Sequence, residues 1–340
     1  PWRTYVNYND PRLIEKYYSQ MKEWFKYVDK YTVDGLLKRW PDTKYRDWYL
    51  GDWLAPMGVD AGNQASVDLV SNCFISECLS TMYKTALTLG NKEEAEEFVM
   101  RREKLNKLIH RTFYRADKGI YSTGSQLDMC YPMLVGVVPD SLYNKVKKNV
   151  IAMTEEKYKG HIAVGLVGVP ILTEWAVRNK QVDFFYQMMK KRDYPGYLYM
   201  IDHGATATWE YWSGERSRVH NCYNGIGTWF YQAVGGIRLD EAKPGYRHFY
   251  VDPQIPNGVT WAKVTKESPY GTIAVNWKLK DDNQLNLQLT VPAGTTATVC
   301  IPNNAVSYKM NEKKVSVKKQ TVDVEAGHYD FLFNLNLGGY

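Results

Sequence analysis

The spacing of apolar residues changes after the Gly235–Gly236 pair, and this change limits what the chain can fold into. Before the pair, apolar side chains recur every three or four residues, as across residues 13–28, which is the spacing of one helix face. After it, apolar and polar residues alternate, as in residues 285–291, which is typical of strands with one buried face. A chain of 340 residues also exceeds the usual size of one hydrophobic core. We therefore predict a helical domain over residues 1–238 and a strand-rich domain over residues 239–340.

The helical part is predicted to consist of helix pairs joined by short loops. Capping residues, glycines and apolar spacing predict helices over residues 10–34, 63–90, 91–114, 126–134, 140–154, 164–179, 182–191 and 222–234. Successive hairpins with polar and aromatic residues in their loops are typical of an (α/α)6-barrel-type helical toroid, whose loops form a pocket at one end. A closed ring of six hairpins needs about twelve helices. The toroid is therefore expected to be incomplete at its N-terminal side.

The last hundred residues predict an antiparallel β-sandwich. Alternating segments at residues 272–277, 285–291, 296–301 and 329–333 are separated by turns containing Asn, Gly and Pro. The solvent-facing positions are mostly Lys, Thr, Gln and Asn, without a catalytic constellation. A supporting role is therefore favoured for this domain over independent ligand binding.

Composition excludes several function classes. The formal net charge of +6 is spread along the chain without a basic stripe, which argues against nucleic-acid binding. Five cysteines without metal-ligand spacing predict free thiols, and neither a metal nor a cofactor is expected. No run of about twenty apolar residues predicts a membrane span. The first residue is Pro1 rather than Met, so the compartment is left open, and a periplasmic or secreted location is compatible with the sequence.

A carboxylate surrounded by aromatic residues is the strongest functional signal. Glu210 lies within residues 204–212, next to Trp209 and close to Trp212. Hydrolysis of a glycosidic bond passes through an oxocarbenium-like transition state and uses paired carboxyl groups, and flat rings stack on the sugar. Glu210 is therefore a candidate catalytic carboxylate, and both tryptophans are candidates for sugar contact. The alternative, that the tryptophans are core packing and Glu210 is a surface acid, is equally compatible with these residue types.

Further polar and aromatic residues are candidates for the same pocket. His220 is expected either to donate a hydrogen bond to a sugar hydroxyl or to Glu210, or to cap a helix without binding a ligand. The loop acids Asp52, Asp60 and Asp128 could orient sugar hydroxyls, although capping is the favoured role for Asp128 and its neighbour Gln126. The rings of Trp48, Trp53, Tyr197 and Tyr199 are candidates for stacking on a sugar or for buried packing.

Several segments together carry a resemblance to a known family. They span nearly the whole chain in the expected order, and they are residues 51–55 (GDWLA), 161–168 (HIAVGLVG), 204–212 (GATATWEYW), 217–231 and 244–253. The chain resembles the C-terminal half of the inverting α-L-rhamnosidases of glycoside hydrolase family seventy-eight. The resemblance implies hydrolysis of terminal α-L-rhamnosides, with a rhamnose-containing glycoside, oligosaccharide or polysaccharide as substrate.

The resemblance also implies roles for individual residues. Glu210 matches the general base that activates the attacking water. His220 matches a histidine that contacts the sugar, and Trp53 matches a tryptophan that shapes the rhamnose subsite, with Asp52 before it in the same loop. The chain departs from the family pattern at three positions near Glu210 and His220, which leaves the exact sugar and the linkage open; these are Ala207, Tyr211 and Val219.

The second carboxyl group is not found in this sequence. The family's general acid lies in an Asp- and Arg-rich motif upstream of a Pro-Trp dipeptide, and this chain begins with Pro1 and Trp2. The acid is therefore expected in the N-terminal remainder of the same polypeptide. Inverting hydrolysis needs both groups, about 6.5–9.5 Å apart, so this chain alone is expected to be inactive.

Two other functions stay open on the sequence. A noncatalytic carbohydrate-binding or interaction module would retain sugar binding without using Glu210. A polysaccharide lyase of the toroid plus β-sandwich type would use His220, Asn221 and Tyr223 for proton abstraction, but it would need several arginines to bind a uronate, and only Arg216 and Arg218 are close in sequence.

Overall fold

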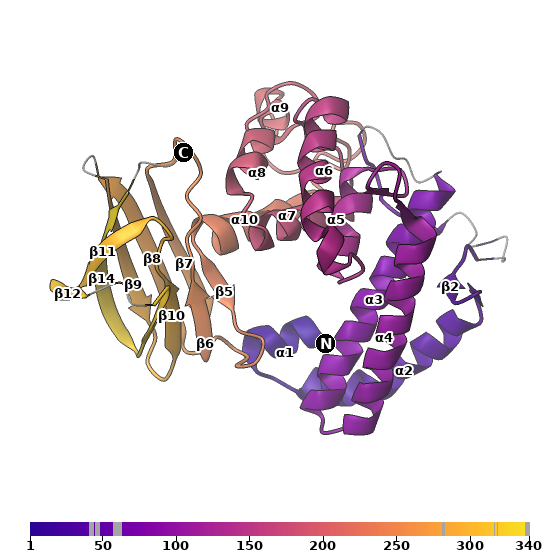
Figure 1. Cartoon of the computed structure of the whole chain (residues 1–340), viewed down its shortest axis with the longest axis horizontal. Coiled ribbons are helices and arrows are strands. Elements are labelled where there is room, and N and C mark those ends of the chain that lie inside the picture. Colours follow the sequence, from indigo (N-terminus) through magenta and orange to yellow (C-terminus); the bar gives the residue numbers. More distant parts are fainter. Residues whose placement is uncertain are drawn as a thin grey trace. The chain divides into compact units, whose positions relative to one another are not determined.

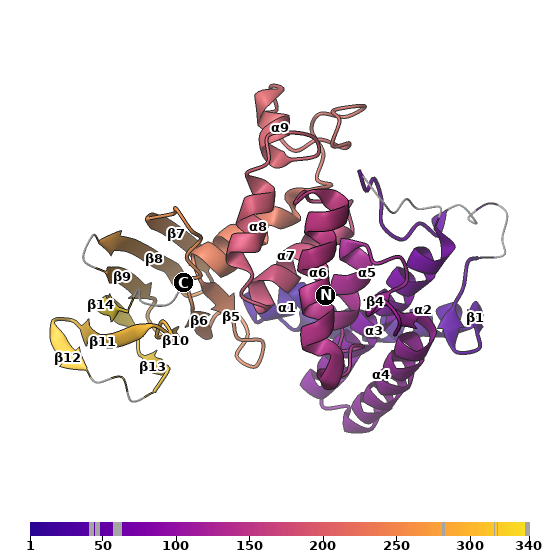
Figure 2. The ribbon, with the colours of Figure 1, turned by 45° about the horizontal axis from the view of Figure 1, so that its top comes forward.

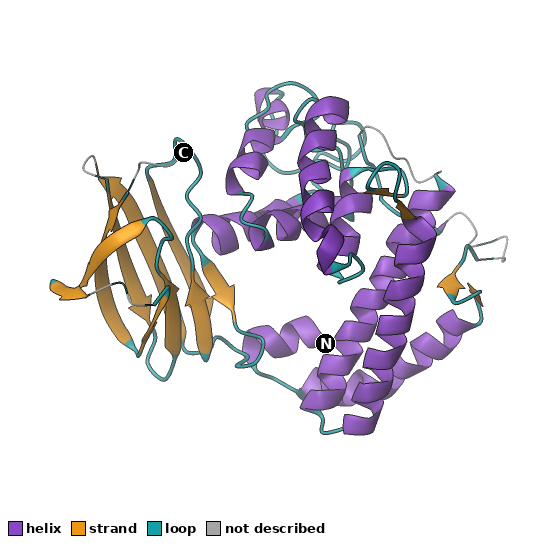
Figure 3. Cartoon of the chain, viewed as in Figure 1, coloured by secondary structure: helices purple, strands orange, loops and turns teal. Residues whose placement is uncertain are grey.

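The chain divides into two compact units (Figure 1). The computed structural model describes residues 1–40, 44, 48–56, 63–280, 283–315, 317 and 319–336. Residues 17–226 form the first unit, which we call the helical unit, and residues 1–16 together with 227–340 form the second, the sandwich unit. A helical region followed by a β-rich region confirms the predicted fold class (Figure 3). The domain boundary after residue 238 stays a prediction.

The helical unit is built from helices joined by short connections and by two short β-hairpins. Its elements are most of α2 (Arg12–Asp29), β1 (Thr32–Val33), β2 (Leu36–Leu37), α3 (Gln64–Thr88), α4 (Lys92–Phe113), β3 (Tyr114–Arg115), β4 (Ile120–Tyr121), α5 (Gln126–Leu134), α6 (Asp140–Tyr158), α7 (Gly168–Arg178), α8 (Val182–Met189), α9 (Tyr197–Asp202) and the 3-10 helix η2 (Asn224–Ile226). The helices from α3 to α8 lie where the apolar spacing predicts them.

The α3–α4 hairpin is the longest helical pair, and Figures 1 and 2 show the two helices side by side. The Asn63 side chain caps α3 by accepting a hydrogen bond from the Ser66 amide at 3.3 Å. Gly90, with φ of +81°, makes the tight turn into α4, a backbone conformation that glycine adopts without a steric penalty. Inside the pair, the Ser76 hydroxyl donates to the Asn106 side chain at 2.6 Å. This buried polar contact fixes the register of the two helices.

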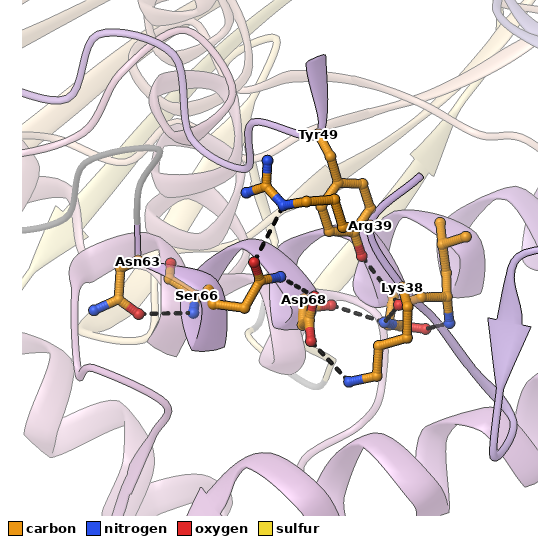
Figure 4. Close-up of polar contacts among 9 residues, drawn as sticks. Lys38, Arg39, Tyr49, Asn63, Ser66 and Asp68 are labelled. Carbon is orange, nitrogen blue, oxygen red and sulfur yellow. Dashed lines mark hydrogen bonds and ion pairs between the residues drawn. The ribbon is translucent and has the colours of Figure 1, made fainter. Parts of the chain in front are cut away.

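A polar network attaches β2 and the segment after it to the first turns of α3 (Figure 4). The Asn72 side chain accepts from the Leu37 amide at 2.8 Å and donates to its carbonyl at 3.0 Å. The Tyr49 hydroxyl donates to the same carbonyl at 3.0 Å, and Lys38 pairs with Asp68 at 2.7 Å. These contacts hold the start of the loop that leads to Trp53.

The sandwich unit contains two facing sheets and a short N-terminal helix. Its elements are α1 (Trp2–Tyr8), the first part of α2, α10 (Gly227–Trp229), the π-helix η3 (Phe230–Val234), β5 (Ile237–Leu239), β6 (His248–Val251), β7 (Trp261–Ser268), β8 (Gly271–Lys280), β9 (Gln284–Val291), β10 (Thr296–Cys300), β11 (Ala305–Met310), β12 (Lys313–Val315), β13 (Thr321–Val324) and β14 (Gly327–Leu335). The strand orders are β13-β10-β6-β5 and β12-β11-β14-β9-β8-β7.

One strand pair corrects the prediction that the sandwich is antiparallel throughout. Strands β6 and β10 pair in parallel, with Phe249 opposite Ala297, while the other described pairs are antiparallel. The parallel pair arises because β7, β8 and β9, which separate β6 from β10 in the chain, lie in the other sheet. The chain therefore returns to the four-stranded sheet by a crossover rather than by a hairpin.

The core of the sandwich follows the predicted alternation. On β8, Ile273, Val275 and Trp277 are buried, while Asn276 between them lies on the opposite face. The Trp277 indole donates a hydrogen bond to the Val234 carbonyl at 2.7 Å, so its polar atom is satisfied inside the core. Burial of these apolar side chains is the main stabilising contribution in this unit.

The single helix predicted over residues 222–234 is wrong in detail. The segment consists of η2, one turn of α10 and the π-helix η3. Gly225 packs so closely on Pro170 that an added Cβ atom would lie 2.9 Å from the proline ring. This close approach packs η2 against α7.

Candidate active site

Glu210 and His220 lie on two chain segments that pair like the arms of a hairpin. The Glu210 amide donates to the Ser217 carbonyl at 2.9 Å, and the His220 amide donates to the Thr208 carbonyl at 2.8 Å. The Thr208 hydroxyl also donates to the His220 carbonyl at 2.5 Å. These hydrogen bonds bring the two candidate residues, ten positions apart in the sequence, to neighbouring places in the fold.

The Glu210 carboxylate is only loosely held by its neighbours. Its side chain is 17% exposed, and the Arg216 guanidinium lies 3.9 Å from Oε1. The Ser217 amide approaches Oε2 at 3.3 Å, which is a long hydrogen bond. Arg216 is 65% exposed, and an ion pair in such a setting stabilises little because water screens it. Oε1 accepts no hydrogen bond from the described part of the chain, so it can accept a proton from a bound water.

Cys222 lies close to Glu210 and is electrically neutral. Burial, together with the negative charge of Glu210, raises the pKa of the Cys222 thiol to about 11. The thiol is therefore protonated at neutral pH and is a poor nucleophile. Cys222 is buried near the carboxylate.

The His220 imidazole has a defined tautomer. The Cys222 amide donates a hydrogen bond to His220 Nδ1 at 3.1 Å, so Nδ1 is the acceptor nitrogen. In the neutral ring the proton is then on Nε2. Nε2 has no partner among the residues that the structure describes, and the side chain is half-buried. The ring therefore offers an N–H donor to a ligand.

Trp209 and Trp212 lie in the interior, and this favours the packing role that the sequence left open. Trp209 is 2% exposed and Trp212 is 1% exposed. The Trp212 indole donates to the Val164 carbonyl at 3.0 Å, and its ring stacks on Tyr223. Gly214 packs against the Trp209 ring, where an added Cβ atom would lie 2.7 Å away. Neither indole has a free face for a sugar, so both hold the Glu210 loop in place.

Asp52 is also engaged in the interior rather than turned toward a ligand. It is 4% exposed, and it accepts hydrogen bonds from the amides of Gly165 at 2.8 Å and Gly168 at 2.9 Å, one on each oxygen. Burial raises the pKa of the Asp52 carboxyl to about 6, although these amides oppose the shift. The geometry gives Asp52 a structural role at the start of α7, instead of the predicted contact with sugar hydroxyls.

Trp53 stands beside the loop that Asp52 holds. Its carbonyl accepts a hydrogen bond from the Leu166 amide at 2.7 Å, and its side chain is partly exposed. An added Cβ atom on Gly165 would lie 1.9 Å from the Trp53 carbonyl oxygen, so only glycine allows this approach. The glycine at position 165, 112 residues after Trp53 in the chain, therefore has a packing reason.

Tyr223 connects the loop of Trp53 with the loop of His220. The Tyr223 hydroxyl donates to the Leu54 carbonyl at 3.2 Å, and the Tyr223 carbonyl accepts from the Tyr197 hydroxyl at 2.8 Å. Because Tyr223 is three residues from His220 and Leu54 follows Trp53, the structure brings these two sequence-predicted residues into one region. Tyr223 was considered in the sequence only as a lyase residue, and its connecting role was missed.

The acids and amides near α5 have capping and bracing roles. The Asp128 amide donates to the capping side chain of Ser125 at 3.1 Å, and the Asp128 carboxylate accepts from the Ser66 hydroxyl at 2.6 Å. Gln126 donates to the His161 carbonyl at 2.9 Å and accepts from the Ala163 amide at 2.8 Å. Burial raises the pKa of Asp128. Asp60, the third loop acid, lies outside the described residues.

The other aromatic candidates differ in their surroundings. Trp48 is 70% exposed. Tyr197 meets the edge of Trp212 with ring centroids 5.2 Å apart. Tyr199 packs on His203 at 4.0 Å between centroids. Tyr197 is half-buried, and its edge contact with Trp212 together with its hydroxyl bond to the Tyr223 carbonyl indicates packing rather than stacking on a ligand.

Among the described residues, no group of three or more His, Cys, Asp and Glu side chains is arranged to hold a metal ion. The helices within that same part of the chain include none whose length and apolar character would allow it to cross a membrane.

Comparison with known proteins identifies two matching families. Residues 1–234 match the bacterial α-L-rhamnosidase six-hairpin glycosidase domain, and residues 236–316 match the bacterial α-L-rhamnosidase C-terminal domain. An α-L-rhamnosidase of Alteromonas sp. (strain LOR) is 27% identical over 350 residues, which cover 97% of this chain and 36% of the relative. The chain thus spans little more than a third of the length of that relative.

Two solved structures share the fold. The α-L-rhamnosidase from Dictyoglumus thermophilum superposes with a TM-score of 0.87 and 21% identity, covering 98% of this chain and 38% of that one. The Streptomyces avermitilis α-L-rhamnosidase complexed with L-rhamnose superposes with a TM-score of 0.83 and 22% identity, covering 98% of this chain and 32% of that one. With most of its length matched by the six-hairpin glycosidase domain, this chain belongs to the bacterial α-L-rhamnosidase family of glycoside hydrolases.

Proposed function

We propose that this chain carries the general base and part of the sugar pocket of an inverting α-L-rhamnosidase. The observation that supports the proposal best is the pairing of the Glu210 and His220 segments, which sets a loosely held carboxylate beside an unpaired imidazole N–H. The connection through Tyr223 adds the partly exposed Trp53 to the same region. A base, a hydrogen-bond donor and an aromatic wall are what a sugar-cleaving site requires.

In this proposal Glu210 activates water. The ionised carboxylate accepts a proton from a water molecule while the water oxygen bonds to the anomeric carbon on the face opposite the leaving group. The glycosidic C–O bond breaks in the same step, and the departing oxygen receives a proton from the general acid. Oε1 is the oxygen suited to this task, because Oε2 is the one that the Ser217 amide approaches.

His220 binds the sugar through Nε2. The hydrogen bond from Cys222 keeps Nδ1 as an acceptor, so the neutral ring presents an N–H to a rhamnose hydroxyl. The neutral Cys222 thiol beside it adds no negative charge to the site. The substrate class is a terminal α-L-rhamnoside, by analogy with the L-rhamnose bound to the Streptomyces avermitilis relative.

The general acid is supplied from outside this sequence in our proposal. The matched relatives are far longer than this chain, which covers 36% of the Alteromonas protein. The buried carboxyl groups of Asp52 and Asp128 are both engaged by backbone and hydroxyl donors, so neither suits proton donation to a leaving group. The 340-residue chain alone is expected to show no turnover of an aryl α-L-rhamnoside, and robust turnover would contradict this assignment.

Two substitutions in one loop test the role of Glu210. In the complete polypeptide, Glu210→Gln is expected to lower kcat about 100- to 10,000-fold, the usual range for a general acid or base. Glu215→Gln removes an exposed acid of the same loop and is the matched control, with little expected effect. A loss below about tenfold for Glu210→Gln would remove it from the mechanism. Retained L-rhamnose binding with no catalytic effect of the substitution would favour a noncatalytic module.

A further inference from the structure

The outer face of the six-stranded sheet has a polar hollow of about 330 Å³. Its lining comes from the sandwich unit only and includes Asn276, Gln288, Thr290, Asn311, His328 and Asp330. These side chains lie on β8, β9, β14 and the turn after β11. The volume is at the lower end of the range for small-molecule sites, roughly 300–1,000 Å³. The hollow therefore has the size of a site for one or two sugar rings rather than for a folded partner.

Strand register aligns the polar side chains across three strands. Asn276 on β8 lies opposite Gln288 on β9, and Gln288 lies opposite Asp330 on β14. Residues directly opposite one another in antiparallel strands point to the same face of the sheet. The three side chains form a row, and the row next to it contains Thr290 opposite His328.

Several hydrogen-bonding groups in the hollow are unused within the described part of the chain. The Gln288 amide has no hydrogen-bond partner there. Asn276 Oδ1 has none either, but neighbouring atoms cover it, so it is not presented to a ligand. Asp330 accepts from Asn286 on Oδ1 at 2.5 Å, which leaves Oδ2 free. His328 uses Nδ1 toward Thr290 at 3.1 Å, which leaves Nε2. Donors and acceptors thus face one small space, as sugar hydroxyls require.

An exposed tryptophan lies on the same face. Trp261 on β7 is 64% exposed and lies opposite Lys278 on β8. Two residues along, Lys263 lies opposite Asn276, so Trp261 projects from the face that carries the hollow. Trp261 does not line the hollow itself, but its open indole stands one strand and two residues from Asn276 on the same face. There it offers a stacking surface for the C–H face of a pyranose, while the amide of Gln288 receives its hydroxyls.

We propose that this hollow is a second carbohydrate-binding site, separate from Glu210, for one or two residues of a neutral glycan. The residues that line the hollow include the carboxylate of Asp330 and neither Lys nor Arg, while Lys263 and Lys278 stand outside the lining on the same face. A uronate inside the hollow would meet Asp330 without a lining cation to balance it, which favours a neutral sugar. Such a site would hold a polysaccharide near the protein without taking part in bond cleavage. The proposal gives the sandwich unit a binding role in place of the purely supporting role that the sequence favoured.

Binding by the 340-residue chain tests the proposal. The probes are L-rhamnose, a rhamnose-terminated trisaccharide, cellohexaose, xylohexaose and, for charge, a galacturonate hexamer, each titrated calorimetrically. At least one neutral probe is expected to bind, and Gln288→Leu and Trp261→Ala are each expected to weaken its Kd at least tenfold. Both side chains are exposed, so both variants should fold. Thr321→Ala, an exposed change on β13 of the four-stranded sheet, is the matched control and should leave Kd unchanged.

A variant of the candidate active site separates this proposal from the preceding one. His220→Ala should leave binding in the hollow unchanged, whatever it does to catalysis. The proposal is overturned if no neutral probe binds, if only the galacturonate hexamer binds, or if Gln288→Leu and Trp261→Ala have no effect on Kd. Binding lost in His220→Ala but kept in both sheet variants would assign the sugar to the Glu210 region alone.

Discussion

Trp212 and Tyr223 stack with ring centroids 4.1 Å apart and planes inclined by 24°. Through the hydrogen bonds of these two residues, the Glu210 loop contacts the Val164 carbonyl and the Leu54 carbonyl, which belong to segments far apart in the sequence. The stacked pair therefore connects the Glu210 loop to both of these segments and holds the candidate site together. The candidate catalytic groups lie around it, on loops rather than on helices.

Removing the Trp212 ring should destabilise the protein strongly. The side chain is 1% exposed, so Trp212→Ala leaves a large cavity and an unpaired Val164 carbonyl. We expect a loss of about 3–5 kcal/mol in the free energy of unfolding, measured by urea denaturation. Trp48→Ala, at a ring that is 70% exposed, is the matched control and should change stability by about 0.5 kcal/mol or less. Equal effects of the two changes would contradict the packing role.

A single methyl group at Gly165 should disrupt the Trp53 loop. Its Cβ atom would lie 1.9 Å from the Trp53 carbonyl oxygen, and backbone atoms cannot move aside cheaply. Gly165→Ala is expected to cost more than about 3 kcal/mol or to prevent folding. Gly227→Ala introduces the same methyl group where nothing lies within 4 Å, and it should be tolerated. Thermal unfolding of both variants makes the comparison, and a stable Gly165→Ala protein would refute the close approach.

Asp52 should make stability depend on pH. Burial raises its pKa to about 6 from the ordinary 3.8, so between these values the folded protein keeps a proton that the unfolded chain releases. Raising the pH through this window therefore lowers the free energy of unfolding, by up to about 3 kcal/mol. Asp52→Asn should remove this fall in the free energy of unfolding. Asp117→Asn changes an exposed side chain and should retain the fall. Denaturation at pH 4, 5 and 6 gives the test, and parallel curves for wild type and Asp52→Asn would contradict the shift.

His220 should contribute to sugar affinity. Loss of the Nε2–H donor in His220→Ala is expected to weaken L-rhamnose binding to the complete polypeptide by about tenfold to a hundredfold, the worth of about 1.5–3 kcal/mol. Val219→Ala, at a neighbouring side chain that is 76% exposed, should bind normally. Calorimetric titration decides the matter. Unchanged affinity in His220→Ala would return this residue to the helix-capping alternative.

Local signals in the sequence were enough to predict most of the helices and the alternating strands. The pair α3 and α4 was predicted to within about two residues, because a long apolar period, capping residues and a glycine turn all agree there. Helix α1 and the short α9 were missed, since seven and six residues show too little periodicity. The parallel pairing of β6 with β10 was missed because nothing within either strand encodes a partner about fifty residues away.

The candidate site shows where sequence reasoning stops. A tryptophan in the sequence can either stack on a sugar or pack in a core, and its residue type does not distinguish the two roles. For Trp209 and Trp212, only their burial in the structure favours packing. Asp52 finds its hydrogen-bond donors 113 and 116 residues later in the chain, so no local pattern indicates that both of its oxygens are engaged. The connecting role of Tyr223 depends on a contact 169 residues away and has no sequence signal.

The stereochemistry of azide rescue tests the role of Glu210 most directly. In the complete polypeptide, Glu210→Ala leaves space for azide, which needs no base to attack the anomeric carbon of an aryl α-L-rhamnoside. We predict that azide restores turnover and that the product is the β-L-rhamnosyl azide, formed with inversion, while Glu215→Ala shows normal hydrolysis without azide. An α-L-rhamnosyl azide, or nearly normal hydrolysis by Glu210→Ala, would contradict the assignment of Glu210 as the water-activating base.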